Sequence, residues 1–395
     1  MTPPAPATGS RPPAAGERRA WGWLAHLRAG GTTPWDGWAG EADASATHGR
    51  LLPGAQQLEL LRRVNAAGRP SAGLVGRVLA ASAPGRGRPD LELAGAVEPG
   101  RFGPRPVDPA ALPADELVRV ATSVLADELV AADLPPVPPG ATRPWRRRFR
   151  LVGDPWLADA ARRQAREQGR EPGGRGSVVL VLADDLATML GHAWCHRVTG
   201  EGAPSWPDWL DDAVRRDRVP PRVDVLQALR RWESRVGRDR VRLVLDPAAL
   251  PRLTGTRGPL SGPPVLPADG AELARRTAPV LGLLVPPERR TRVLREVLVP
   301  RLAAAGGPPL VVPAEHDRWV RTRAVRLRDA ARSAGYPVVG DPDGLLPGHP
   351  DGVPEPSEEG VLALAVRLLL AADAGAGAGT DAGTGTEDDR GSEDR

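Results

Sequence analysis

The chain of 395 residues contains no lysine and no isoleucine, and it has one cysteine, one tyrosine, two phenylalanines and two methionines. Without lysine there is no side-chain amine for a Schiff base or a phosphate-binding loop, and arginine can bind a phosphate but cannot act as a base. The single Cys195 excludes an intramolecular disulfide and a multi-cysteine metal site. Because chains without disulfides are typical of reducing compartments, we expect a cytoplasmic protein.

Long blocks of one charge and long apolar runs are also missing. The net charge of +4 comes from 53 basic and 49 acidic residues that are interspersed along the chain. Such mixing gives only modest long-range attraction to nucleic acid, so a nucleic-acid partner is not expected, although a basic nucleic-acid-associated protein stays open as an alternative. No apolar run reaches membrane-spanning length, and the first residues lack the apolar core of a signal peptide, so we expect no membrane partner.

Both ends of the chain are poor in large apolar side chains. Residues 1–17 are rich in proline, alanine and glycine, and residues 373–395 form an acidic tail rich in glycine and threonine. Neither segment can bury enough apolar surface to repay the entropy of ordering, so both are predicted to be disordered. A proline-rich linker at 136–145 is predicted to separate a helical N-terminal domain at 18–135 from an α/β domain at 146–372.

Tryptophan recurs at one spacing in two distant stretches of the chain. The two sets are Trp23, Trp35 and Trp38 in the first stretch and Trp194, Trp206 and Trp209 in the second. Each set precedes a predicted helix with a pair of arginines, at 58–69 and at 226–238, and the segments that begin at Pro113 and Pro267 also resemble each other. Echoes that keep one order predict an internal repeat, so the N-terminal region is predicted to be partly duplicated. Coincidence in a chain rich in alanine, leucine and arginine is the alternative.

After residue 148 the chain alternates short apolar runs with amphipathic helical patterns. The runs are predicted to be strands at 149–153, 178–183, 240–245, 309–313 and 336–340. Alternating strands and helices predict an α/β fold with a parallel sheet that helices cover on both faces. Ligands in such sheets bind outside the carboxyl ends of the strands. The candidate ligand-binding residues at these ends are Gly153, Asp154, Asp184 and Asp185.

Several segments of this part resemble a known family. They are FRLVGDPWLADAARRQAREQG from Phe149, VVLVLADDLATMLGHAW from Val178, SWPDWLDD from Ser205 and SAGYPVVGDPDGLL from Ser333. Together they are similar to the sulfotransferase-like proteins of high-GC actinobacteria, which belong to the family that takes sulfate from phosphoadenosine phosphosulfate. The likeness runs over about 147–372 and implies a P-loop sulfotransferase-like fold.

The chain departs from the family at each point of the donor site. The resemblance implies a Lys-x-Gly-Thr-Thr loop after the first strand, and an arginine and a serine that bind the 3′-phosphate of the cofactor. Here the loop after Gly153 is too short to wrap a phosphate, Asp184 stands at the arginine position, and the serine position falls near His192. Because a transferring sulfuryl group needs positive donors, the sequence predicts a degenerate relative with no catalytic residue, and with no cofactor unless the donor site survives.

These observations predict a sulfotransferase-like protein without catalysis that acts as a binding or scaffold partner in cell-surface glycan or sulfated-metabolite assembly. Its own partner would be a protein or a glycan-type small molecule. An active sulfo- or glycosyltransferase with a rearranged donor site is the alternative from the enzyme class. His192 and Arg147 complete the candidate ligand-binding residues, and Arg147 belongs to three arginines before the first strand that would contact an anion or simply face water.

One further pattern would suit a glycosyltransferase. Asp341 and Asp343 follow the last predicted strand in the Asp-x-Asp form by which many such enzymes hold a divalent metal, since hard cations prefer carboxylate oxygens. Aspartate and proline at a strand end are also typical of a plain turn, and no metal site is predicted.

Overall fold

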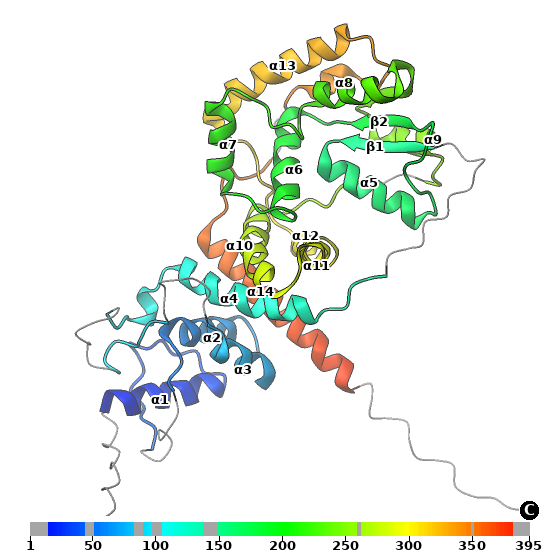
Figure 1. Cartoon of the computed structure of the whole chain (residues 1–395). Helices are drawn as coiled ribbons and strands as arrows, with labels where there is room; N and C mark the ends of the chain where they lie inside the picture. The colour runs from blue at the N-terminus through cyan, green and yellow to red at the C-terminus, as the bar shows by residue number, and fades with distance from the viewer. Residues whose placement is uncertain are drawn as a thin grey trace, which may run out of the picture. The chain divides into compact units, whose positions relative to one another are not determined.

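The computed structural model describes residues 15–43, 51–82, 90–96, 105–136, 148–258, 262–348 and 351–381 (Figure 1). The chain divides into two compact units, of which the first comprises 1–128 and 358–395 and the second comprises 129–357. This division differs from the predicted one, which places all of 146–372 in one domain. No helix among the described residues is both long enough and apolar enough to cross a membrane.

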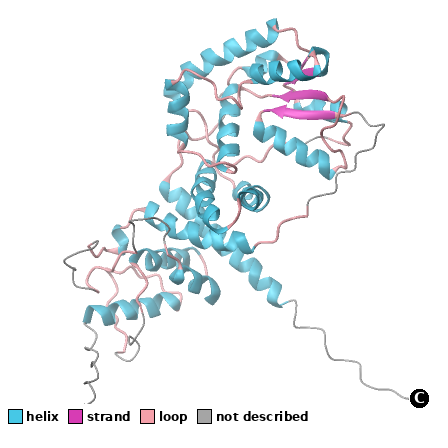
Figure 2. Cartoon of the chain, in the orientation of Figure 1, coloured by secondary structure: helices cyan, strands magenta, loops and turns pink. Residues whose placement is uncertain are grey.

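The first unit is built of helices (Figure 2). They are α1 (Ala15–Arg28), α2 (Ala55–Ala67), α3 (Ala72–Ala80), most of α4 (Ala114–Ala131) and α14 (Glu358–Asp381). The closing helix α14 belongs to this unit because it packs on α2 and α3. Arg63 of α2 pairs with Glu359 at 3.3 Å, and Asp373 accepts hydrogen bonds from the N–H and the hydroxyl of Ser71 at 2.6 and 2.5 Å. The helical pattern of α14 is visible in the sequence, whereas its packing partner is not.

Both predicted disordered ends are helical where the structure describes them. Residues 15–17 begin α1, and residues 373–381 continue α14. Once a helix is nucleated and packed, each further residue adds a hydrogen bond, so a helix extends beyond its apolar part even into a run of alanine and glycine. The rest of both ends, and residues 137–145 of the predicted linker, lie outside the described residues.

The second unit contains every strand that the structure describes (Figure 2). The strands are β1 (Phe149–Gly153), β2 (Val178–Leu182), β3 (Val241–Val244) and β4 (Val338–Val339). The helices are α5 (Pro155–Glu167), α6 (Leu186–Val198), α7 (Trp206–Arg215), α8 (Val225–Val236), α9 (Leu250–Thr254), α10 (Ala268–Leu284), α11 (Pro287–Val293), α12 (Val299–Ala305) and α13 (Asp317–Ser333). The strands form one parallel sheet in the order β1-β2-β3-β4. The predicted α/β class, with a parallel sheet flanked by helices, is confirmed.

The predicted strand at 309–313 is not part of this sheet. Its residues make only isolated bridges, from Leu310 to Val353 and from Pro309 to Pro267. Prolines lie at both sides of the run, and because proline has no N–H to donate it is excluded from the interior of a sheet. The run is apolar, as its composition indicates, but it lies outside the sheet.

Helices cover both faces of the sheet, and Figure 1 shows β1 and β2 between α5 and α8. On one face, Leu151 of β1 packs with Leu157 of α5 in a cluster of buried apolar side chains. On the other face, Val181 of β2 is fully buried, and the guanidinium of Arg150 lies 5.6 Å from the centre of the Trp232 ring of α8. The continuous apolar runs of the strands are therefore explained by burial on two sides.

The strands follow one another across the sheet in the order of the chain. Open α/β sheets bind ligands in the crevice that forms where the strand order reverses. A consecutive order contains no reversal, so the four described strands do not create that crevice by themselves. Any cavity near their carboxyl ends must be formed by segments that pack outside the sheet.

The first two tryptophans of each recurring set are buried, whereas the third, Trp38 or Trp209, is half-buried. In the first unit, Nε1 of Trp23 donates to the backbone carbonyl ten residues further on at 2.9 Å, and its ring centre lies 5.3 Å from that of Trp35. In the second unit, Nε1 of Trp194 donates to the carbonyl ten residues further on at 3.1 Å, and its ring centre lies 5.8 Å from that of Trp206. Trp23 and Trp194 thus share one local geometry, since each satisfies its donor ten residues further on. The second ring of each pair differs, because Trp35 donates to the carbonyl of Ala94, whereas the buried Nε1 of Trp206 has no hydrogen-bond partner among the described residues.

Candidate functional site

The carboxyl end of β1 is a tight turn that requires glycine. Gly153 ends β1 with a φ of +103°, in a region that side chains rarely adopt. A Cβ at this position would lie 2.1 Å from the carbonyl oxygen of Leu182 at the end of β2. The N–H of Asp154 donates to the same carbonyl at 2.8 Å. Gly153 is therefore a structural residue that fixes Asp154 beside the end of β2.

Asp154 is a buried carboxylate whose oxygens are both engaged. One oxygen accepts the N–H groups of Trp156 and Leu157 at 2.9 and 3.0 Å, and so caps the N-terminus of α5. The other accepts Nδ1–H of His192 at 2.7 Å. Only 1% of Asp154 is exposed, so these three hydrogen bonds replace its hydration. The turn after β1 is thus stabilised from within the chain.

Asp185 has the same capping role after β2. Its carboxylate accepts the N–H groups of Ala187 and Thr188 at 3.0 and 3.1 Å and caps α6. The neighbouring Asp184 accepts the N–H of Asp185 at 2.9 Å. Burial, together with the negative charges of Asp185 and Asp154, raises the pKa of Asp184 above its usual range. Two helices that follow strands therefore begin at carboxylates, and a third carboxyl group lies beside them.

His192 connects the two strand ends. It lies on α6, and its ring reaches Asp154 at the end of β1. Burial lowers the pKa of His192, but the negative charges of Asp154, Asp184 and Asp185 outweigh that effect, so its pKa is raised overall. Because Nδ1 donates to Asp154, Nε2 is the atom that can exchange a proton, and it has no hydrogen-bond partner among the described residues.

A second pair of histidine and aspartate lies beside the first and was not predicted. Nε2 of His196 lies 3.1 Å from Asp159 of α5, and Nδ1 of His196 accepts from Arg222 at 2.9 Å. Arg295 binds Asp159 at 2.7 Å, and Arg162 binds it as well. Burial raises the pKa of Asp159, but the hydrogen bond from His196 and the charges of Arg162 and Arg295 outweigh it, so this pKa is lowered. Because a guanidinium can only donate, Nδ1 of His196 is the acceptor in the contact with Arg222, and Nε2 is the nitrogen that faces Asp159.

A signal for the two pairs is present in the sequence. His192 and His196 are four residues apart, which places them on one face of a helix, and Asp154 and Asp159 stand five residues apart at the start of another. Because α5 packs against α6, His192 contacts Asp154 and His196 contacts Asp159. No local pattern predicts that packing, so the pairs were missed.

Other candidate residues lie elsewhere or are already occupied. Arg147 lies outside the described residues, and its neighbour Arg148 precedes β1, at the amino end of the strand and away from Asp154. Burial raises the pKa of the Cys195 thiol to about 12, so this side chain is a poor nucleophile at neutral pH.

The Asp-x-Asp pattern does not form an open pair of carboxylates. Asp343 pairs with Arg328 at 3.3 Å and with Arg332 at 2.8 Å, while Asp341 accepts the N–H of Asp343 at 2.9 Å and caps the turn. Within the described residues, no group of three or more histidine, cysteine, aspartate or glutamate side chains is arranged to hold a metal ion. The plain-turn interpretation accounts for these contacts.

The structure therefore brings Gly153, Asp154, Asp184, Asp185 and His192 together at one edge of the sheet. This cluster, here called the acidic edge, is rich in carboxylates and can move a proton at Nε2 of His192. The backbone donors that a phosphate would use at the start of α5 and α6 are bound by Asp154 and Asp185. Comparison of the chain with models of protein families, with curated proteins and with solved structures gave no match.

Proposed function

We propose that this chain is a sulfotransferase-like protein without catalytic activity that acts as a binding or scaffold partner in cell-surface glycan or sulfated-metabolite assembly. One observation carries the proposal: Asp154 and Asp185 occupy the N-termini of the helices after β1 and β2. A phosphosulfate donor needs those N–H groups and a cation beside them. A carboxylate in the same place satisfies the N–H groups and repels the donor.

The charge of the acidic edge favours a ligand with hydroxyl groups. A carboxyl group and an imidazole can each accept or donate a hydrogen bond, depending on their protonation. Asp184, with its raised pKa, and Nε2 of His192 offer both possibilities within one cluster. Sugar hydroxyls also donate and accept, which supports a glycan-type small molecule as the partner.

A thermal-shift experiment tests this proposal on the full chain. The midpoint of unfolding is measured with phosphoadenosine phosphosulfate, with maltotriose and chitotriose, and with a short DNA duplex. We expect no shift with the phosphosulfate or with DNA, and a saturable rise of a few degrees with a neutral oligosaccharide well above its dissociation constant. Asp184→Asn should remove that rise, whereas the exposed control Asp351→Asn should keep it. A saturable rise with the phosphosulfate would overturn the proposal.

A transferase with a rearranged donor site is the second candidate. It is favoured by the pairing of His192 with Asp154, because an aspartate on Nδ1 orients an imidazole for general base catalysis at Nε2. Incubation with phosphosulfate or sugar-nucleotide donors and a set of hydroxyl acceptors tests this alternative. Donor-dependent product that disappears in His192→Gln would support it over the binding protein.

We further infer that the helical parts of the two units descend from one duplicated module, as the tryptophan spacing predicts. Glu59 of α2 is 2% exposed and accepts from the arginines three and four residues later at 2.6 and 3.0 Å. Glu272 of α10 is 4% exposed and accepts from the arginines at the same two positions at 2.6 and 2.7 Å. A buried glutamate clamped in this way is a specific arrangement, since unpaired it would be costly.

The start of each helix repeats a second contact. The N–H of Ala55 donates to the carbonyl of Leu91 at 2.7 Å, and the N–H of Ala268 donates to the carbonyl of Pro308 at 2.9 Å. Two residues further on, each acceptor segment forms an isolated parallel bridge, Leu93 with Val107 and Leu310 with Val353. These contacts support a repeat that aligns α2 with α10. The sequence echoes had instead aligned 58–69 with 226–238, and the segment from Pro113 with the segment from Pro267, which leads into α10.

A further inference from the structure

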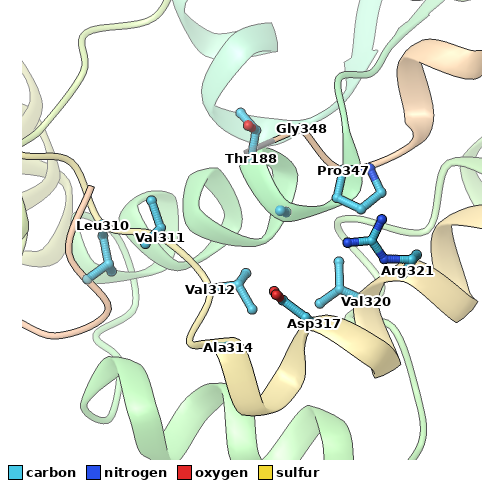
Figure 3. A pocket seen from close by; sticks show the side chains of 11 residues that line it. Thr188, Leu310, Val311, Val312, Ala314, Asp317, Val320, Arg321, Pro347 and Gly348 are labelled. Carbon is cyan, nitrogen blue, oxygen red and sulfur yellow. The ribbon is translucent and has the colours of Figure 1, made fainter. Parts of the chain in front are cut away.

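The second unit has a cavity of about 190 Å³ beside the start of α6 (Figure 3). Residues 310–314, the first turns of α13 and residues 347–348 form its other walls. These segments pack outside the sheet, and they supply the hollow that the consecutive strand order does not. Pockets for drug-sized ligands are roughly 300–1,000 Å³, so this cavity suits a smaller molecule.

One wall of the cavity is apolar. Leu310, Val311 and Val312 come from the run that was predicted to be a strand, and the buried Val320 and the half-buried Pro347 face them (Figure 3). The run is held beside the cavity by hydrogen bonds with Val353, whose carbonyl accepts the N–H of Val311 at 3.0 Å. These aliphatic side chains offer an apolar surface against which a small hydrocarbon group could be buried.

Two opposite charges also line the cavity. Asp317 and Arg321 lie one turn apart on α13, both are exposed, and Figure 3 shows both side chains at the cavity. Among the described residues neither of them has an ion pair or a hydrogen bond through its side chain, although charges at this spacing commonly pair on a helix. Other arginines of the same helix are paired, Arg323 with Asp217 and Arg328 with Asp343.

We propose that this cavity binds a small zwitterion with a branched apolar group, namely an α-amino acid of the size of valine or leucine. Its ammonium group binds Asp317, and its carboxylate binds the guanidinium of Arg321, which can hold a carboxylate through two parallel hydrogen bonds. Its side chain lies against Val311, Val312 and Val320. The site adjoins the acidic edge, because Ala187 and Thr188 line the cavity and donate to Asp185, but it shares no residue with the acidic edge and does not depend on the glycan ligand proposed above.

Titration calorimetry of the full chain with L-leucine tests the proposal, with two analogues that each lack one charge. N-acetyl-L-leucine has no ammonium group, and L-leucinamide has no carboxylate. We expect saturable binding of L-leucine and at least about tenfold weaker binding of each analogue, since each loses a hydrogen bond between charged groups. Failure of L-leucine to bind at about 10 mM, which corresponds to less than 3 kcal/mol, would overturn the proposal.

Substitutions identify the site. Asp317→Asn and Arg321→Gln should each weaken L-leucine binding by about tenfold. Arg318→Gln is the matched control, because Arg318 is an exposed arginine of the same helix that does not line the cavity. Asp184→Asn should leave L-leucine binding unchanged, so this test and the oligosaccharide test can fail separately. Equal affinity in Arg321→Gln and in the unmodified chain would place the amino acid elsewhere and refute the site.

Discussion

The two capping aspartates allow a matched test of the acidic edge. Asp154 and Asp185 each follow a strand, and each accepts two N–H groups at the start of a helix. They differ in one contact, because Asp154 also accepts Nδ1–H of His192 at 2.7 Å and is 1% exposed. The difference between Asp154→Ala and Asp185→Ala therefore measures what the link to His192 and the burial contribute.

The expected magnitudes follow from these contacts. Asp185→Ala removes a helix cap, which costs about 1 kcal/mol of the free energy of unfolding. Asp154→Ala removes a cap of the same kind and leaves Nδ1 of the partly buried His192 without its partner, which adds about 2 kcal/mol. We therefore expect a total loss of about 3 kcal/mol for Asp154→Ala. Asp154→Asn should lie between the two, since an amide oxygen can still cap the helix, but the amide nitrogen only donates, so Nδ1 of His192 would have to lose its proton and accept.

Urea denaturation followed by far-ultraviolet circular dichroism measures these losses. The chain has two units, so the transition to which the second unit contributes must be identified from the shift in Asp185→Ala before the variants are compared. The double substitution of Asp154 and His192 by alanine should cost less than the sum of the single changes, as expected for residues in contact. Equal losses in Asp154→Ala and Asp185→Ala would refute the link between β1 and α6.

Three further outcomes are expected. Because the pKa of His192 is raised, the stability that its protonated form contributes is complete below about pH 6.5 and is lost as the pH rises through the raised pKa. His192→Gln should therefore flatten the decline in stability on the alkaline side, which urea midpoints at several pH values would measure. Gly153→Ala should lose at least about 3 kcal/mol or fail to fold, because its Cβ would meet a backbone carbonyl at 2.1 Å, whereas Gly176→Ala, with positive φ and open space, should lose about 1 kcal/mol in the same assay. If the two helical modules are duplicates, Glu59→Gln and Glu272→Gln should each cost about 2 kcal/mol, and a large loss in only one of them would contradict equivalent roles.

The sequence predicted the acidic edge because parallel strands end at one side of a sheet. Gly153 and Asp184 could be assigned to that edge from the end of each apolar run, before any contact was known. What it could not predict is that Asp154 and Asp185 turn inwards as helix caps, since the same acidic residues would also suit an open ligand site. Whether an aspartate caps the next helix depends on the direction of the backbone after the strand. Lengthening or shortening the turn by one residue would change that direction.

The misassigned segments share a different cause. The run at 309–313 has the composition of a strand, yet its prolines restrict it to isolated bridges beside the sheet. The closing helix α14 has a clear helical pattern, yet it packs on α2 and α3 rather than on the helices nearest to it in sequence. In both cases the sequence predicts the conformation of the segment but not the segments against which it packs, because packing depends on burial over the whole unit.

The geometry of the acidic edge also bears on how a donor site could be regained. A helix N-terminus binds a phosphate only when its N–H groups are free, so Asp154 would first have to be replaced by a residue that does not cap from within. That change would leave Nδ1–H of His192 without an acceptor beside Asp184, which has a raised pKa already. Replacing Asp154 alone therefore removes the acceptor of a buried hydrogen-bond network and leaves the imidazole of His192 unsatisfied. At least a second change, at His192, is needed to offset this loss of stability. We expect a single Asp154→Gly variant to be destabilised and still to bind no phosphosulfate, which the thermal-shift measurement can test directly.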